Sequence, residues 1–153
     1  MQNTFYKIFL ILIVLYSMFF FIGSTLYPIA AHFQLWEFAD KISLLFIHAC
    51  HRQPDRTFFI YEYPVALCCR CYGFYLGIII SGIFAFCNKL KLNKNTITIF
   101  IIISLFEVSI SLIYGTQFNS GNITRFLVGI IMGMLLIKTA HYLFQISRKG
   151  EKI

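Results

Sequence analysis

The stretch that decides the fold is residues 8–27, IFLILIVLYSMFFFIGSTLY. It carries no charge and is long enough to cross the hydrocarbon core of a bilayer, which takes about 20 apolar residues. It is longer than the usual apolar region of a signal peptide, and only Lys7 supplies a charge in front of it. We therefore interpret it as a retained membrane anchor that stops at Pro28.

The composition of the whole chain agrees with this interpretation. The 153 residues are 59% hydrophobic and 12% charged, whereas soluble domains are about 45–50% apolar and about 25% charged. A soluble domain of this size has too little interior to bury so much apolar surface. We therefore expect lipids as partners, and we assign the net charge of +7 to topology and anionic headgroups rather than to nucleic acid.

Further apolar stretches predict an all-α membrane protein, with four transmembrane helices plus one amphipathic surface or re-entrant helix. Residues 1–153 are expected to form a single integral membrane domain, with spans at about 8–27, 66–87, 96–114 and 122–144. The surface helix is expected at about 33–50, where apolar residues recur at helical spacing among charged ones. Residues 51–64, which contain two prolines, are expected to form an outer loop.

The basic residues predict how the chain is oriented in the cell membrane. Four spans place Lys7, the lysines of residues 88–95 and the basic C-terminal tail on one side, where they outweigh the acidic residues. Cytoplasmic segments of multi-pass proteins are enriched in Lys and Arg. Both termini are therefore expected in the cytoplasm, and the cysteine-rich segment is expected to be extracytoplasmic.

That segment is the chemically distinctive part of the chain. Cys50 and His51 end the surface helix, and Cys68 and Cys71 form a C-x-x-C pair at the start of the second span. Three thiols and an imidazole match a tetrahedral zinc site in ligand type and number. The sequence thus predicts metal ligands for zinc or another soft-to-borderline ion, with His48 as an alternative to His51.

Charged residues near the cysteines and inside a span suggest further roles. A helix N-terminus and Arg70 are expected to favour thiolates. Arg56, Arg70 and Arg125 are expected at one face, where they would bind an anion or support the metal ligands. Glu107 lies inside the third span, where an acid is costly, and is expected to pair with Arg125 or to serve in an ion relay.

A purely structural disulfide among the clustered cysteines stays open on the sequence alone, as do two other functions. In a membrane thiol-disulfide oxidoreductase, Cys68 and Cys71 would be the reactive pair and Cys50 would resolve it. In a small transporter or channel component, Glu107 and Arg125 would line the path. Whether the protein is an enzyme, which substrate and protein partners it has, and whether it forms a homo-oligomer are not decided by these patterns.

Several spaced motifs resemble the prokaryotic membrane-protein family called domain of unknown function 2085. Its pattern has a Cys-His-x-x-x-x-Arg block, then C-x-R-C-x-G-x-Y-x-G, then S-x-N-x-x-R-x-x-x-G. The matching positions are Cys50, His51, Arg56, Cys68, Arg70, Cys71, Gly73, Tyr75, Gly77, Ser120, Asn122, Arg125 and Gly129. The resemblance covers about residues 40–135 and implies a membrane protein without implying an activity. Cys69 stands where the family usually has a small residue, so it is not included in the expected site.

Overall fold

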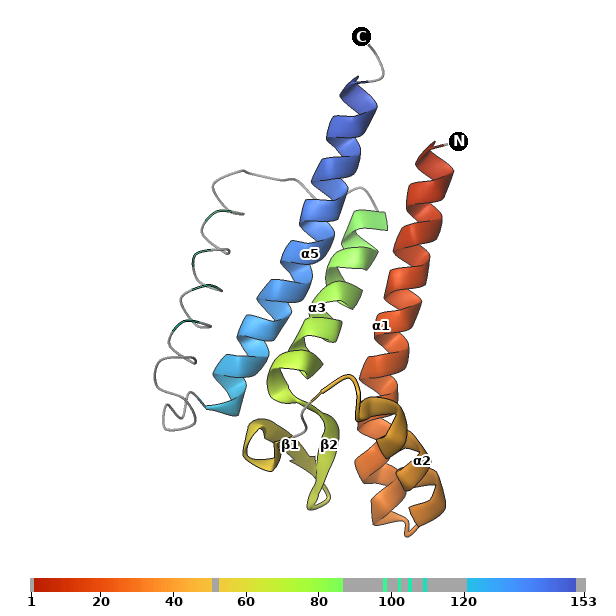
Figure 1. Ribbon diagram of the computed structural model, residues 1–153, viewed down its shortest axis with the longest axis vertical. Coiled ribbons are helices and arrows are strands. Elements are labelled where there is room, and N and C mark those ends of the chain that lie inside the picture. Colours follow the sequence, from red (N-terminus) through yellow and green to blue (C-terminus); the bar gives the residue numbers. More distant parts are fainter. Residues whose placement is uncertain are drawn as a thin grey trace.

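The computed structural model describes residues 2–50, 53–86, 98, 102, 105, 109 and 121–150. The elements are α1 (Gln2–His32), α2 (Trp36–Phe46), the 3₁₀ helix η1 (Pro54–Arg56), β1 (Thr57–Ile60), β2 (Tyr63–Cys68), α3 (Cys69–Phe86) and α5 (Asn122–Gly150). The three long helices lie side by side, with α2 and the two strands gathered at one end (Figure 1).

The protein is mostly helical, and three described helices are long and apolar enough to cross a membrane. They are Thr4–His32, Cys69–Phe86 and Asn122–Phe144. These helices correspond to the first, second and fourth expected spans. The third expected span, residues 96–114, falls almost entirely outside the described residues, as does Glu107 within it.

The expectation that the first span stops at Pro28 is wrong, because α1 continues through the proline to His32. Proline removes one backbone hydrogen bond from a helix interior, and packing of the next turn offsets that loss. Ala30 and Ala31 are buried against Ala39 of α2. The carbonyl of Ala30 also accepts a 2.9 Å hydrogen bond from the Leu35 amide at the start of α2.

Glycines allow α3 and α5 to pack backbone against backbone. A Cβ atom on Gly73 would overlap the carbonyl oxygen of Phe126, and one on Gly129 would overlap the carbonyl oxygen of Arg70. One turn further along, Gly77 lies against Ile130, so positions on both helices advance together. The two helices therefore run parallel, with the small-x-x-x-small spacing that brings helices close in lipid.

Helix α1 runs antiparallel to this pair. The Tyr6 hydroxyl lies 2.7 Å from Nδ1 of His141 in a buried hydrogen bond, and the Tyr6 ring stacks on Phe144 with centroids 4.3 Å apart. The beginning of α1 and the later part of α5 thus lie at the same end of the bundle. Figure 1 shows both chain termini at this end, opposite the strands.

The segment expected as an outer loop, residues 51–64, contains regular structure that was not expected, because β1 and β2 form an antiparallel hairpin. Its two-residue turn has positive φ at Tyr61 (51°) and Glu62 (70°), a conformation that usually takes Asn-Gly or Asp-Gly. The strand β2 is held by burial of Val65 and the two residues that follow it. The hairpin takes up residues 57–68, so α3 begins at Cys69 rather than at residue 66.

The expected surface helix is present as α2, over Trp36–Phe46. It buries Ala39, Ile42 and Phe46 along one face. The Phe46 ring meets Phe20 of α1 edge-on at 5.2 Å between centroids, and it occupies the space left beside Gly23. In Figure 1, α2 folds back along the last turns of α1. This packing brings the end of α2 beside the hairpin.

Candidate metal centre

Three cysteine thiols from different elements meet at the hairpin end of the bundle. Cys50 follows α2, Cys68 ends β2 and Cys71 lies in the first turn of α3. Their Sγ atoms all lie within 4.8 Å of one another; we call these three residues the thiol cluster. A zinc ion about 2.3 Å from each sulfur holds sulfurs about 3.8 Å apart in a tetrahedron, so small side-chain rotations suffice to close the cluster on a metal.

Local packing determines where each thiol lies. The amide of Cys50 donates a 3.2 Å hydrogen bond to the carbonyl of Phe46, which extends the last turn of α2. Cys50 is only 9% exposed and packs in a core cluster with Ala66 and Leu67 of β2. Cys68 is the register partner of Thr57 in the hairpin. The sequence analysis did not predict this hairpin, and it is the hairpin that places Cys68 next to Cys50.

The sequence analysis expected the cluster cysteines to ionise readily to thiolates, and the surroundings of Cys68 have the opposite effect. Cys50, Cys68 and Cys71 are thiols rather than disulfides. The pKa of Cys68 is raised, chiefly by its hydrogen bond with the Cys50 thiol, against a lowering effect of Cys71 and with a further increase from burial. Neighbouring sulfurs at this distance cannot all be negative unless a cation compensates them. A bound metal ion would supply that compensation and displace the protons.

One backbone hydrogen bond already points at a sulfur. The Cys68 amide donates to Sγ of Cys50 at 3.3 Å. Hydrogen bonds to metal-bound sulfur orient the ligand and tune the metal. The hairpin therefore contributes a candidate ligand, Cys68, and also a backbone donor that would stabilise a thiolate on Cys50.

The remaining candidate ligands are placed differently. His48 is exposed and does not lie with the three cysteines of the thiol cluster. His51 lies outside the described residues. Cys69 is fully buried and does not join the cluster. Within the described part of the chain, the protein thus brings together three thiols that could serve as metal ligands.

A cavity of about 370 Å³ adjoins the thiol cluster. Its lining residues are Ala49, Cys50, Gln53, Arg56, Cys68, Arg70, Cys71 and Arg125; we call it the arginine cavity. The structure thus brings together the three arginines that the sequence analysis grouped. Ala49 and Gln53 were not anticipated, and no pattern in the sequence marks them as lining residues.

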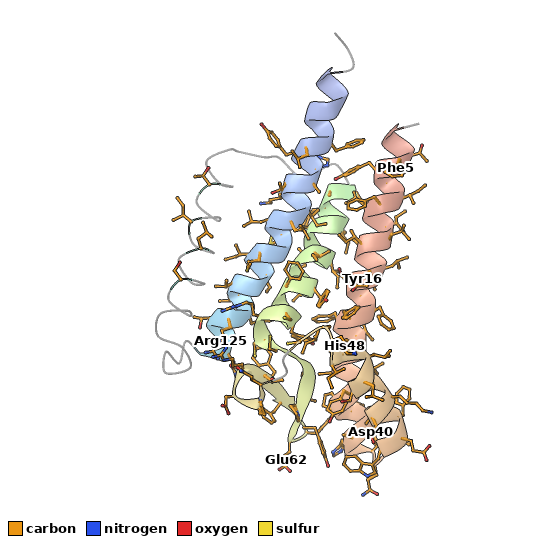
Figure 2. All side chains as sticks on the ribbon, in the orientation of Figure 1. Phe5, Tyr16, Asp40, His48, Glu62 and Arg125 are labelled. Carbon is orange, nitrogen blue, oxygen red and sulfur yellow. The ribbon has the colours of Figure 1, made fainter. Side chains whose placement is uncertain are left out.

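The arginines reach the cavity from three elements. Arg56 ends η1, Arg70 lies in the first turn of α3 and Arg125 in the first turn of α5. Arg125 is only 6% exposed, and Figure 2 shows it at the start of α5, close to the hairpin. The side-chain amide of Asn122 donates a 3.3 Å hydrogen bond to the Thr57 carbonyl, which ties the start of α5 to β1.

These features define a helical membrane protein with a thiol cluster and an arginine-lined cavity at one end of its bundle. The chain belongs to the family described as "Predicted membrane protein (DUF2085)", whose family model matches residues 50–138. The match begins at the first cysteine of the cluster and includes all three arginines. The resemblance inferred from the spaced motifs is therefore confirmed.

Two archaeal relatives extend this similarity. An uncharacterized protein of Methanocaldococcus jannaschii is 31% identical over 137 residues, which is 82% of this chain and 86% of the relative. An uncharacterized protein of Methanothermobacter thermautotrophicus is 30% identical over 95 residues, which is 61% of this chain and 85% of the relative. No solved structure matches the chain.

Proposed function

We propose that the thiol cluster binds zinc or another soft-to-borderline metal ion. The observation that carries this proposal is the meeting of three Sγ atoms from α3, β2 and the end of α2 within 4.8 Å. Thiolate sulfur is a preferred ligand of zinc, and zinc would neutralise the negative charge of three neighbouring thiolates. The amide of Cys68 directed at Cys50 supports the same assignment.

His51 is the fourth ligand that we propose. It directly follows Cys50, and an imidazole completes the Cys₃His set of a tetrahedral site. The arginine cavity is lined by all three sulfur ligands, so a molecule in the cavity would lie beside the metal. This arrangement supports a metal site that lies beside a cavity into which a small molecule fits.

We also propose a four-span bundle with both termini in the cytoplasm and the thiol cluster outside. The parallel packing of α3 and α5 supports it, because the end of α3 and the start of α5 then lie at opposite ends of the bundle. The chain between Phe86 and Gly121 has to connect those ends, and the apolar residues 96–114 are long enough to do so. The basic residues near both termini favour the cytoplasmic side.

Metal and thiols are best measured together on purified full-length protein. We expect about one zinc ion per chain, with the cluster thiols protected from an alkylating reagent until a chelator removes the metal. Alkylation followed by peptide mapping identifies the thiols that react. Metal-free protein with a Cys68–Cys71 disulfide that dithiothreitol opens reversibly would contradict the metal assignment and favour the oxidoreductase alternative.

Reporter fusions at the C-terminus test the orientation. We expect a fused fluorescent protein to fluoresce, because it folds in the cytoplasm, and fused alkaline phosphatase to be inactive, because it matures only outside. The same two reporters fused after Tyr61, an exposed residue of the hairpin turn, in chains truncated at that point, should give the reverse result. An active phosphatase at the C-terminus would refute the proposed orientation.

A further inference from the structure

The arginine cavity has a charge pattern of its own. Three arginines line it, and its other lining residues are three cysteines, one glutamine and one alanine. Arginine stays protonated under all ordinary conditions. If the thiol cluster holds a divalent metal as three thiolates, that unit carries about one negative charge in total, which leaves the surroundings strongly positive. The cavity therefore favours an anion with or without the metal.

The donors of this cavity suit a particular anion. The planar fork of arginine pairs with two oxygens at once, and phosphate offers enough oxygens for several arginines. A carboxylate has only two oxygens and a single charge, so it matches one arginine rather than three. The volume of about 370 Å³ lies within the range of about 300–1,000 Å³ of small-molecule sites, so the cavity has room for more than an isolated ion.

The placement of Arg125 indicates that the cavity is a built site. Its side chain is 94% buried at the start of a helix that is apolar enough to span a membrane. An ionisable residue at such a position is costly and generally marks a binding or transport function. The hydrogen bond between Asn122 and Thr57 holds this turn of α5 against the start of β1, and Arg56 is the residue directly before Thr57.

We propose that the arginine cavity binds the phosphoryl group of a ligand, next to the metal position. The group belongs either to a lipid headgroup or to a small phosphorylated solute, and both share the chemistry that the arginines recognise. The inference rests on the guanidinium groups rather than on the proposed metal. It can therefore stand if the thiol cluster proves to be metal-free.

Calorimetry on the full-length protein in a phosphate-free detergent tests this inference. The probes are inorganic phosphate, dihexanoyl phosphatidic acid as a soluble headgroup, and acetate. We expect at least one phosphate probe to bind and acetate to bind much more weakly. Arg56→Gln should weaken phosphate binding by at least about tenfold, since hydrogen bonds to charged groups are the strong ones.

The matched control is Lys41→Gln, which removes the same charge from an exposed residue of α2 that does not line the cavity. It should leave phosphate binding unchanged. Arg56→Lys keeps the charge but loses the fork, so it should bind phosphate with intermediate affinity. The helical circular dichroism of each variant, measured on the same sample, shows that the protein still folds whether or not it holds zinc.

The outcomes distinguish a lipid headgroup from a soluble phosphorylated ligand, and they distinguish the phosphate proposal from the metal proposal. Binding of phosphatidic acid alone identifies a lipid headgroup, whereas binding of inorganic phosphate with equal or higher affinity identifies a soluble ligand. The inference is overturned if neither phosphate probe binds, if acetate binds equally well, or if Arg56→Gln and Lys41→Gln behave alike. Phosphate binding to protein without zinc would end the metal proposal and leave this one intact.

Discussion

Replacing Cys50 with alanine is expected to abolish stoichiometric metal binding. Cys50 lies within 4.8 Å of both other sulfurs and receives the amide hydrogen bond of Cys68. In the proposed Cys₃His site, its loss removes one ligand and leaves two thiolates and the imidazole of His51 to hold the metal. Loss of a hydrogen-bond partner of a ligand already costs about 10–100-fold in metal affinity, so we expect loss of the ligand itself to cost at least about 100-fold. Metal content by elemental analysis and a competition titration with a chelator measure the effect.

Cys69→Ala is the control for this substitution. Cys69 is the immediate neighbour of Cys68, is fully buried and stands outside the thiol cluster. Removing its sulfur costs some packing but no ligand, so the variant should keep its zinc. Equal zinc contents in Cys50→Ala and Cys69→Ala would show that the metal, if present, is held elsewhere.

Replacing Gly73 with alanine is expected to destabilise the bundle strongly. The new methyl group would overlap the backbone carbonyl of Phe126, and backbone cannot move aside as a side-chain tip can. Overpacking of this kind costs about 1–3 kcal/mol, and the helix propensity of alanine offsets less than about 1 kcal/mol of it. Gly129→Ala should behave similarly, because its methyl group meets the carbonyl of Arg70. Unfolding of the detergent-solubilised protein by sodium dodecyl sulfate gives the free energy of unfolding.

Gly121→Ala is the matched control, because none of the described residues lies within 4 Å of the position that its Cβ would take. Its free energy of unfolding should stay close to that of the wild type. Because Arg70 and Arg125 stand on the two glycine-paired helices, Gly129→Ala should also disturb the arginine cavity. A Gly73→Ala variant as stable as Gly121→Ala would mean that α3 and α5 do not pack as described.

The sequence anticipated the helices and the ligand types for simple physical reasons. Uninterrupted apolar stretches have to be buried in lipid and have to satisfy their backbone internally, so the helix of residues 8–27 was predictable from its composition. The apolar face of α2 was visible in its helical spacing. The cysteines were identifiable because they are clustered along the chain, and the arginines because they lie within or close to the same spaced motifs.

The hairpin was missed because its local signals are unfavourable. Tyr61 and Glu62 adopt positive φ angles in its turn, although neither residue type favours them. Burial of Val65 and of the residues after it stabilises β2 instead. The passage of α1 through Pro28 has the same kind of cause, since packing of Ala30 and Ala31 outweighs a local cost.

By itself, then, the sequence determined that this is a helical membrane protein of a recognisable family and which residue types form its candidate site. Only the tertiary structure decided that Cys50 and Cys68 meet, that Gln53 joins the lining and that three arginines face one cavity. The physical reason is that hydropathy and motif spacing describe only residues that are close together in the sequence. Convergence of α2, the hairpin, α3 and α5 depends on packing between residues far apart in sequence, such as Asn122 on Thr57 and Gly73 on Phe126.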